Sequence, residues 1–199
     1  FHHKIVSLAE VPSRIAALRK SGLTVAHCHG VFDLLHPGHV DHLEEARQLA
    51  DILVVSVTAD DYVNKGPGRP IYGIEHRLKM LASLGIVDLV FESNSPTALL
   101  AIDHVKPDFF VKGPDYQTLD DDITGNITLE RNQVEKNGGS LVTTQAPSMS
   151  SSQIINSQGL AHSPEAESWL HDFREAFGAE EVSDWVNRIS GLNIVVVGE

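Results

Sequence analysis

A strand-like apolar run and an amphipathic helix pattern meet within residues 24–49, and a turn rich in glycine and histidine joins them. Residues 24–26 are strand-like. After the turn, apolar residues recur at every third position with polar residues between them, namely Val40, Leu43, Ala46 and Leu49. That spacing is typical of a helix that packs one face on a sheet. The sequence therefore predicts a strand, a tight turn and a helix in succession, as in α/β proteins.

The turn itself, residues 29–39, has the composition of a phosphate-binding site. The first amides of a helix have no partner within it, and the helix dipole adds partial positive charge, so anions bind there readily. Gly30 and Gly38 lack a Cβ and let phosphate oxygens approach the backbone, while Pro37 suits a first helical turn. We expect His36 and His39 to point at the same phosphates from one side of the turn.

Two other interpretations of these histidines stay open. His36 and His39 could only cap the helix. Alternatively, the region could bind a metal, because it gathers five histidines and the single cysteine: His27, Cys28, His29, His36, His39 and His42. Zinc sites usually show four ligands at recognisable spacings, and alternation along a strand places His27 and His29 on the face opposite Cys28. The pattern therefore favours phosphate contact.

The rest of the chain alternates strand-like and helix-like runs. We predict strands at residues 52–57, 109–111 and 141–143, a helix with Ile74, Leu78, Leu81 and Ala82 on one face, and a helix from Ser95 and Pro96 through Val105. This order predicts an α/β fold, a Rossmann-like doubly wound parallel sheet with a C-terminal helical extension. Ligands of such folds bind where the strands end.

Charge and cysteine content narrow the partners and the compartment. The formal net charge of −12 argues against nucleic acid or an anionic membrane surface as a partner. One cysteine, no membrane-length apolar stretch and no signal-peptide pattern predict a cytoplasmic protein. In such an acidic chain, the positions of the few lysine and arginine residues are informative about function. Several of them lie between or beside the motifs.

Beyond residue 160 the pattern changes. Two helical stripes follow, one with Trp169, Phe173 and Phe177 and one with Val182, Trp185, Val186 and Ile189, and residues 194–197 form a strand-like end. We predict an N-terminal helical lead-in (1–22), an α/β domain (23–158), a helical extension (159–191) and the start of a further domain (192–199). The apolar stripes are too wide to leave in water, so we expect them to pack on the preceding domain, on a partner protein or against a second copy of the chain, and we favour the homodimer.

Residues 30–39 resemble the HxGH signature of the nucleotidylyltransferase superfamily, in the GxFDxxHxGH form of its cytidylyltransferase-like branch. Further elements follow in the family order across residues 24–156, namely Arg69-Pro70-Ile71, Glu75-His76-Arg77, Val111-Lys112-Gly113 and Ser150-Ser151-Ser152. Within the family, the chain is most similar to the adenylyltransferase half of the bifunctional heptose-phosphate enzymes. The strand-like end resembles the first strand of a sugar kinase, so the resemblance implies a fusion to such a kinase.

The resemblance implies a set of site residues. The expected catalytic residues are His36, His39, Lys65 and Arg77. The expected nucleotide-binding residues are Gly30, Val31, Phe32, Asp33, Gly38, Lys112, Ser150, Ser151 and Ser152. The expected acceptor-binding residues are Arg69 and Asp115. For Arg77 a solvated helix face, for Lys65 a plain surface turn and for Asp33 a simple turn cap are the alternatives. Pro114 replaces a glycine that the heptose enzymes tend to have, which weakens the inference to their acceptor.

The implied reaction is transfer of a nucleoside monophosphate to a sugar phosphate with release of pyrophosphate. ATP is the expected nucleotide and CTP the alternative. Mg²⁺ is expected on the triphosphate oxygens, with no protein side chain as its direct ligand. Two other functions stay open: a glycerol- or alcohol-phosphate cytidylyltransferase, and a nucleotide-sensing module without catalysis that serves a fused kinase.

Overall fold

The computed structural model describes residues 1–66, 68–113, 126–145, 151, 154–155 and 164–189. It divides into two compact units, Phe1–Leu160 and Ala161–Glu199, which are described separately below. The domain boundary predicted after residue 158 and the strand predicted at 194–197 lie outside the described residues.

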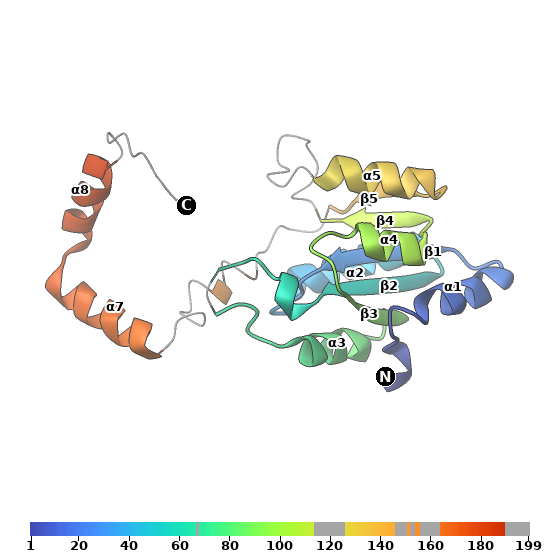
Figure 1. The fold of residues 1–199 in the computed structure, drawn as a ribbon, viewed down its shortest axis with the longest axis horizontal. Coiled ribbons are helices and arrows are strands. Elements are labelled where there is room, and N and C mark those ends of the chain that lie inside the picture. The colour runs from blue at the N-terminus through green and yellow to red at the C-terminus, as the bar shows by residue number, and fades with distance from the viewer. Residues whose placement is uncertain (67, 114–125, 146–150, 152–153, 156–163, 190–199) are drawn as a thin grey trace, which may run out of the picture. The chain divides into compact units, whose positions relative to one another are not determined.

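The first unit is built on five parallel strands. These are β1 (Val25–Gly30), β2 (Ile52–Thr58), β3 (Leu89–Ser93), β4 (Phe109–Lys112) and β5 (Ser140–Thr143), in the order β3-β2-β1-β4-β5 (Figure 1). The order reverses between β1 and β4. The prediction of a doubly wound, Rossmann-like parallel sheet is confirmed, and in such sheets the ligand crevice lies outside the strand ends at the point of reversal.

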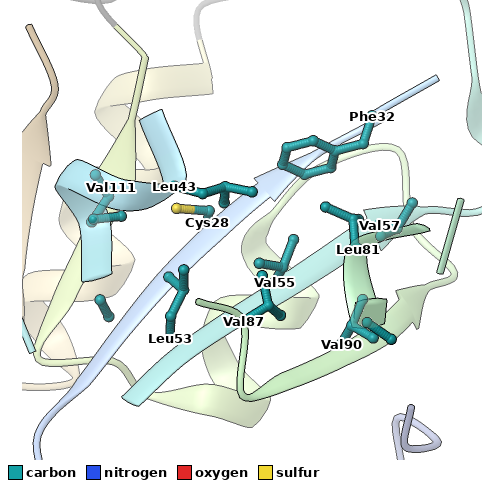
Figure 2. Packing of buried hydrophobic residues seen from close by; sticks show 13 residues of the cluster. Cys28, Phe32, Leu43, Leu53, Val55, Val57, Leu81, Val87, Val90 and Val111 are labelled. Carbon is teal, nitrogen blue, oxygen red and sulfur yellow. The ribbon is translucent and has the colours of Figure 1, made fainter. Parts of the chain in front are cut away.

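Helices cover both faces of this sheet. On one face, α2 (Pro37–Gln48) and α3 (Ile74–Ser83) pack against the strands, and Figure 2 shows the cluster around Cys28, Leu43 and Leu81. On the other face lie α1 (Val11–Lys20), α4 (Leu99–Val105) and α5 (Asn126–Lys136). Short 3-10 turns, η1 (His2–Lys4) and η2 (Asp60–Tyr62), complete the described elements. The inner strands are buried on both faces, as their unbroken apolar runs indicate.

Several elements differ from the sequence-based expectations. Strand β3 and helix α5 were not predicted. The helix expected from Ser95 begins only at Leu99, so that prediction was wrong at its start. Ser95 Oγ instead accepts a hydrogen bond from the amide of Thr97 at 3.3 Å. A serine side chain that bonds the backbone two residues on closes a turn, and the helix begins after it.

The second unit contains two helices, α7 (Pro164–Ala176) and α8 (Ala179–Ile189), which confirms the two predicted helical stripes except at Phe177, one residue beyond the end of α7. A row of aromatic rings joins them: Trp169 stacks on Phe173 at 5.0 Å between centroids, Phe173 lies 4.9 Å from Phe177, and Phe177 lies 5.0 Å from Trp185. Among the described residues, no helix of either unit is long and apolar enough to cross a membrane.

Candidate functional site

The loop between β1 and α2 brings His36 and His39 together at the start of α2. His36 is the N-cap residue in an extended conformation (φ −141°, ψ 167°), and Pro37 follows as the first helical residue. The two imidazole rings stack with their centroids 3.8 Å apart and their planes at 24°. Both ring nitrogens of His36 and Nδ1 of His39 are buried without a hydrogen-bond partner in the described part of the chain. These polar atoms therefore lack a partner that a bound ligand would supply.

The two histidines are held neutral in the unliganded protein. Burial lowers the pKa of His36. Burial, together with His36, His42 and Lys65, lowers the pKa of His39 to about 3. A negatively charged ligand against these rings would favour their protonated forms and raise both pKa values. The pair can therefore donate hydrogen bonds to phosphate either as neutral rings or as cations.

Phe32 holds this loop in its unusual shape. Its backbone lies in the left-handed region (φ +49°), which costs a non-glycine residue roughly 1–2 kcal/mol. The ring is buried and lies 5.2 Å from the His39 ring. It also covers Gly30, because a Cβ there would lie 3.1 Å from Phe32 Cε2. Both residues therefore shape the loop beneath the histidines, and Gly38, at the start of α2, is buried as well.

Asp33 ties the loop after residue 68 to the histidine loop. Its Oδ1 accepts hydrogen bonds from the amides of Ile71 at 2.7 Å and Tyr72 at 3.2 Å, and its Oδ2 pairs with Arg69 Nε at 2.6 Å. The side chains of Asp33 and Arg69 are 0% and 1% exposed. Of the roles left open for Asp33, the structure favours loop organisation, because both carboxylate oxygens are engaged. Arg69 reaches this carboxylate with Nε, while its Nη2 is buried without a hydrogen-bond partner among the described residues.

Arg77 was expected to present a cation to the phosphates, with a solvated helix face as the alternative. The side chain is fully buried, so the solvated face is wrong. Its guanidinium bonds the carbonyls of Val31 at 2.6 Å and Tyr72 at 2.9 Å, and pairs with Asp60 Oδ1 at 2.5 Å. Arg77 thus joins the histidine loop to two neighbouring segments from within α3, which is a positioning role.

Lys65 lies on the exposed loop after η2, near the histidines. Partial shielding from water, together with Arg69, lowers its pKa, whereas Asp33 acts in the opposite direction. The positive charge of Lys65 also contributes to the low pKa of His39, which places the two side chains in the same neighbourhood. The structure therefore brings Lys65 into the site and leaves its role as a proposal.

Lys112 on β4, the neighbour of β1, and Glu130 on α5 form a largely buried ion pair. Lys112 Nζ lies 2.8 Å from Glu130 Oε2 and 5.8 Å from the centre of the Phe110 ring. The pair borders a pocket of about 320 Å³ at the strand ends, which His29, Gly30, Val31, Thr58 and Lys65 also line. Sequence reasoning missed Glu130, because nothing in the motif indicates which helix of the fold returns a carboxylate to this edge.

The remaining candidates are only partly described. Ser151 is buried and its hydroxyl donates to the carbonyl of Leu34 at 3.0 Å, so this part of the serine run lies against the histidine loop. Ser150, Ser152 and Asp115 lie outside the described residues.

The histidine-rich region does not form one cluster. His27 and His29 both contact Ser56, on the face of β1 opposite Cys28, and His42 bonds Thr144 Oγ1 at 3.0 Å from within α2. Within the described residues, no group of three or more histidine, cysteine, aspartate or glutamate side chains is arranged to hold a metal ion. The described arrangement is a histidine pair with unpartnered ring nitrogens at a helix N-terminus, where anions bind readily, beside a polar pocket at the switch point of the sheet.

A parallel doubly wound sheet with paired histidines at the first crossover defines a nucleotide-binding α/β domain. The sequence profile described as cytidylyltransferase-like matches residues 27–157. The chain belongs to this family, which makes the first unit a nucleotidylyltransferase domain.

Curated relatives agree with this assignment. The bifunctional protein HldE of Methylococcus capsulatus is 41% identical over 127 residues, 63% of this chain and 27% of its own length. The protein of the same name from Nitrosococcus oceani is 41% identical over 155 residues, 76% of this chain and 31% of its own length. The chain thus spans about 27% of the length of the first such relatives.

Solved structures show the same fold. A lipopolysaccharide core biosynthesis protein from Thermoplasma volcanium is similar over 64% of this chain and all of its own, with 26% identity and a TM-score of 0.54. The pantoate-beta-alanine ligase of Francisella tularensis matches 76% of this chain and 72% of its own, with a TM-score of 0.52. Its identity is 16%, so that likeness concerns the fold alone.

Proposed function

We propose that this chain transfers AMP from ATP to the phosphate of a sugar phosphate, a heptose phosphate by its likeness to the bifunctional relatives, and releases pyrophosphate. The observation that supports this most directly is the stacked His36–His39 pair, with unpartnered ring nitrogens at the N-terminus of α2. Such an arrangement suits a triphosphate, whose charge it meets with hydrogen-bond donors and a helix dipole. The identity of about 41% to HldE proteins favours a sugar phosphate over glycerol phosphate as the acceptor.

The reaction needs alignment and charge stabilisation and no covalent intermediate. An oxygen of the acceptor phosphate attacks the α-phosphorus in line, the bond from that phosphorus to the α,β-bridging oxygen breaks, and pyrophosphate leaves with the electron pair. His36 and His39 donate hydrogen bonds to the phosphate oxygens that gain charge, and Lys65 adds a cation from its loop. The acceptor is already an anion, so no general base is required.

Mg²⁺ is part of this proposal as an ion held by the nucleotide. The described carboxylates near the site are already paired: Asp33 with Arg69, Asp60 with Arg77 and Glu130 with Lys112. This donor set fits a metal that keeps its water and phosphate ligands. When bound, Mg²⁺ would supply positive charge that offsets the charge of the triphosphate.

Two assays test the proposal. A thermal-shift screen of nucleoside triphosphates with Mg²⁺ identifies the base, and we expect ATP to stabilise the protein more than CTP. Pyrophosphate release is then measured with a panel of aldose 1-phosphates and glycerol 3-phosphate. Stabilisation by CTP alone, with turnover of glycerol 3-phosphate, would make the protein a cytidylyltransferase. Tight ATP binding without pyrophosphate release from any acceptor would make it a sensing module.

The oligomer and the compartment remain part of the proposal. Trp169, Val186 and Ile189 of the second unit are 60%, 60% and 54% exposed, which supports a self-association surface on this unit. A kinase domain fused to the chain, which the relatives' bifunctional names support, could cover the same surface. The single free cysteine, Cys28, supports a reducing, cytoplasmic location.

A further inference from the structure

A hydrogen-bonded row of polar side chains connects β1 and β2 beside the pocket. The proposed reaction assigns no role to it. Ser56 Oγ lies 2.8 Å from His27 Nε2 and 2.8 Å from His29 Nδ1. His29 Nε2 lies 3.3 Å from Thr58 Oγ1. His29 and Thr58 both line the pocket of about 320 Å³, whereas His27 and Ser56 are fully buried behind them.

When both imidazole rings are neutral, the protons of His27, Ser56 and His29 can be arranged in only two ways. A serine hydroxyl has one proton, so it donates to one imidazole and accepts from the other. If Ser56 donates to His29 Nδ1, both rings carry their proton on Nε2. If it donates to His27 Nε2, both rings carry their proton on Nδ1. The two rings therefore share one tautomer in either case.

The surroundings of His27 select between these two proton arrangements. His27 Nδ1 is buried without a hydrogen-bond partner among the described residues, and the rings of Phe110 and Phe91 lie 5.2 and 6.2 Å from the His27 ring. Orphaned buried N–H groups are rare in proteins, so this nitrogen is better left without a proton. The His27 proton then lies on Nε2, Ser56 donates to His29, and His29 keeps its proton on Nε2, at the pocket.

We infer that His27 and Ser56 fix the tautomer of His29, and that His29 Nε2–H donates a hydrogen bond to a hydroxyl of the acceptor sugar in this pocket. The contact from Nε2 to Thr58 is the longest of the three, which leaves this proton available to a ligand. Of the two lysines that line the pocket in the described part of the chain, Lys112 already faces Glu130 and Lys65 lies on the exposed loop near the histidine pair, so the remaining wall offers a mixture of donors and acceptors that suits hydroxyl groups. Burial lowers the pKa of both His27 and His29, so both imidazole rings stay neutral.

This inference rests on the proposed function for the nature of the ligand, but its first test does not. Long-range ¹H–¹⁵N spectra of the whole chain labelled with ¹⁵N-histidine report the tautomer of each ring. The expected result is Nε2–H for both His27 and His29 at pH 7. Protons on Nδ1 of both rings, or a charged ring, would overturn the inference.

Ser56→Ala and Ser93→Ala form a matched pair for the same spectra. Ser93 is also fully buried, in the neighbouring strand β3, and its hydroxyl has no hydrogen-bond partner in the described residues. Ser56→Ala should turn the single tautomer of His29 into a mixture, while Ser93→Ala should leave both rings unchanged. An unchanged His29 signal in Ser56→Ala would show that the hydroxyl does not set the tautomer.

Kinetics with the best aldose 1-phosphate of the panel test the ligand contact. His29→Ala should raise the acceptor KM about five- to tenfold, the value of one hydrogen bond, with the KM for ATP within about twofold. His29→Gln, whose amide can reach the Nε2 position, should recover more of the loss than His29→Asn. An unchanged acceptor KM would overturn the contact, whereas absence of turnover by the wild-type chain would overturn the proposed function and leave the tautomer test standing.

Discussion

The guanidinium of Arg77 is buried and bonds to other parts of the protein. Its guanidinium bonds the carbonyls of Val31 and Tyr72 and the carboxylate of Asp60. The histidine loop and the loop after residue 68 therefore depend on one buried side chain of α3. Lysine has a single charged nitrogen and cannot satisfy three partners in this fixed geometry.

We predict that Arg77→Lys lowers the free energy of unfolding by roughly 3 kcal/mol, since it leaves buried acceptors unpaired. Urea denaturation measures the change, and calorimetry should show weaker ATP binding because Val31 loses its support. Lys79→Ala, on an exposed position of the same helix, is the control and should stay within about 0.5 kcal/mol. Equal stability of the two variants would contradict a positioning role for Arg77.

The buried histidines make stability depend on pH. Burial lowers the pKa of His27, lowers that of His29 to about 3 and lowers that of His42 to about 4. In the unfolded chain these groups titrate near 6.5, so below that pH the unfolded state binds more protons. The stability that they provide is complete above pH 6.5 and is lost as the pH falls toward the folded values.

We therefore expect the free energy of unfolding to fall by about 1 kcal/mol for each of these groups between pH 7 and pH 5.5. Urea denaturation at several pH values measures the slope. His42→Gln removes one of the groups, and its slope should be smaller by one such contribution. A stability that stays constant from pH 7 to pH 5.5 would show that the three imidazoles are not held neutral.

At the level of single residues, the motif predicted position better than role. His36 and His39 could be expected side by side because the signature places them within one helical turn, and the structure stacks them. The burial of Arg77 and the pairing of Arg69 with Asp33 could not be expected, because they depend on how distant loops fold against the motif. The Lys112–Glu130 pair joins two elements separated by residues 113–125, which no local pattern reveals.

At the level of elements, helix α2 determines the position of the histidine pair, because its apolar face packs against the sheet. Leu43 is fully buried in the cluster with Cys28 and Val111 (Figure 2), and Ala46 is fully buried in the same cluster. At the end of the same stripe, Leu49 is 37% exposed. The helix N-terminus, and with it the histidine pair, therefore lies at a position set by core packing.

Leu43→Ala should lower the free energy of unfolding by about 2–5 kcal/mol, because it removes buried methyl groups and leaves a cavity. Thermal and urea unfolding measure the loss. Leu49→Ala, at the C-cap position of the same helix, is the matched control and should cost about 1 kcal/mol or less. Similar losses for the two variants would mean that the face of α2 is assigned wrongly.

Element prediction succeeded for β2, β4, β5, α2 and α3, and it missed β3 and α5. The buried strand β2 and helices α2 and α3 follow from their apolar periodicity. Strand β3 lies at the edge of the sheet, and the N-terminal segment completes its pairing: Ile5 bridges Val90, and the amide of Val6 donates to the carbonyl of Val90 at 3.0 Å. A contact between residues so far apart in sequence leaves no periodic signal.

At the level of the whole molecule, the second unit provides the surface for the proposed association. Its aromatic row joins α7 to α8, while Val186 and Ile189 remain more than half exposed. We predict a dimer by light scattering at micromolar concentration, and Val186→Ser with Ile189→Ser should dissociate it. Asp172→Asn, an exposed control on α7, should leave the mass unchanged. A monomeric wild-type chain would rule out self-association through this surface.

The central claim, nucleotidyl transfer by the His36–His39 site, is tested most directly by the fate of the ATP phosphates. With ATP labelled at the α-phosphorus, Mg²⁺ and an aldose 1-phosphate, the label should appear in a nucleotide sugar, and label at the β- and γ-phosphorus should appear in pyrophosphate. His39→Ala should slow both transfers by roughly a hundredfold, as expected for the loss of one preorganised donor. The account would be contradicted if label from the γ-phosphorus reached the acceptor, or if His39→Ala turned over at the wild-type rate.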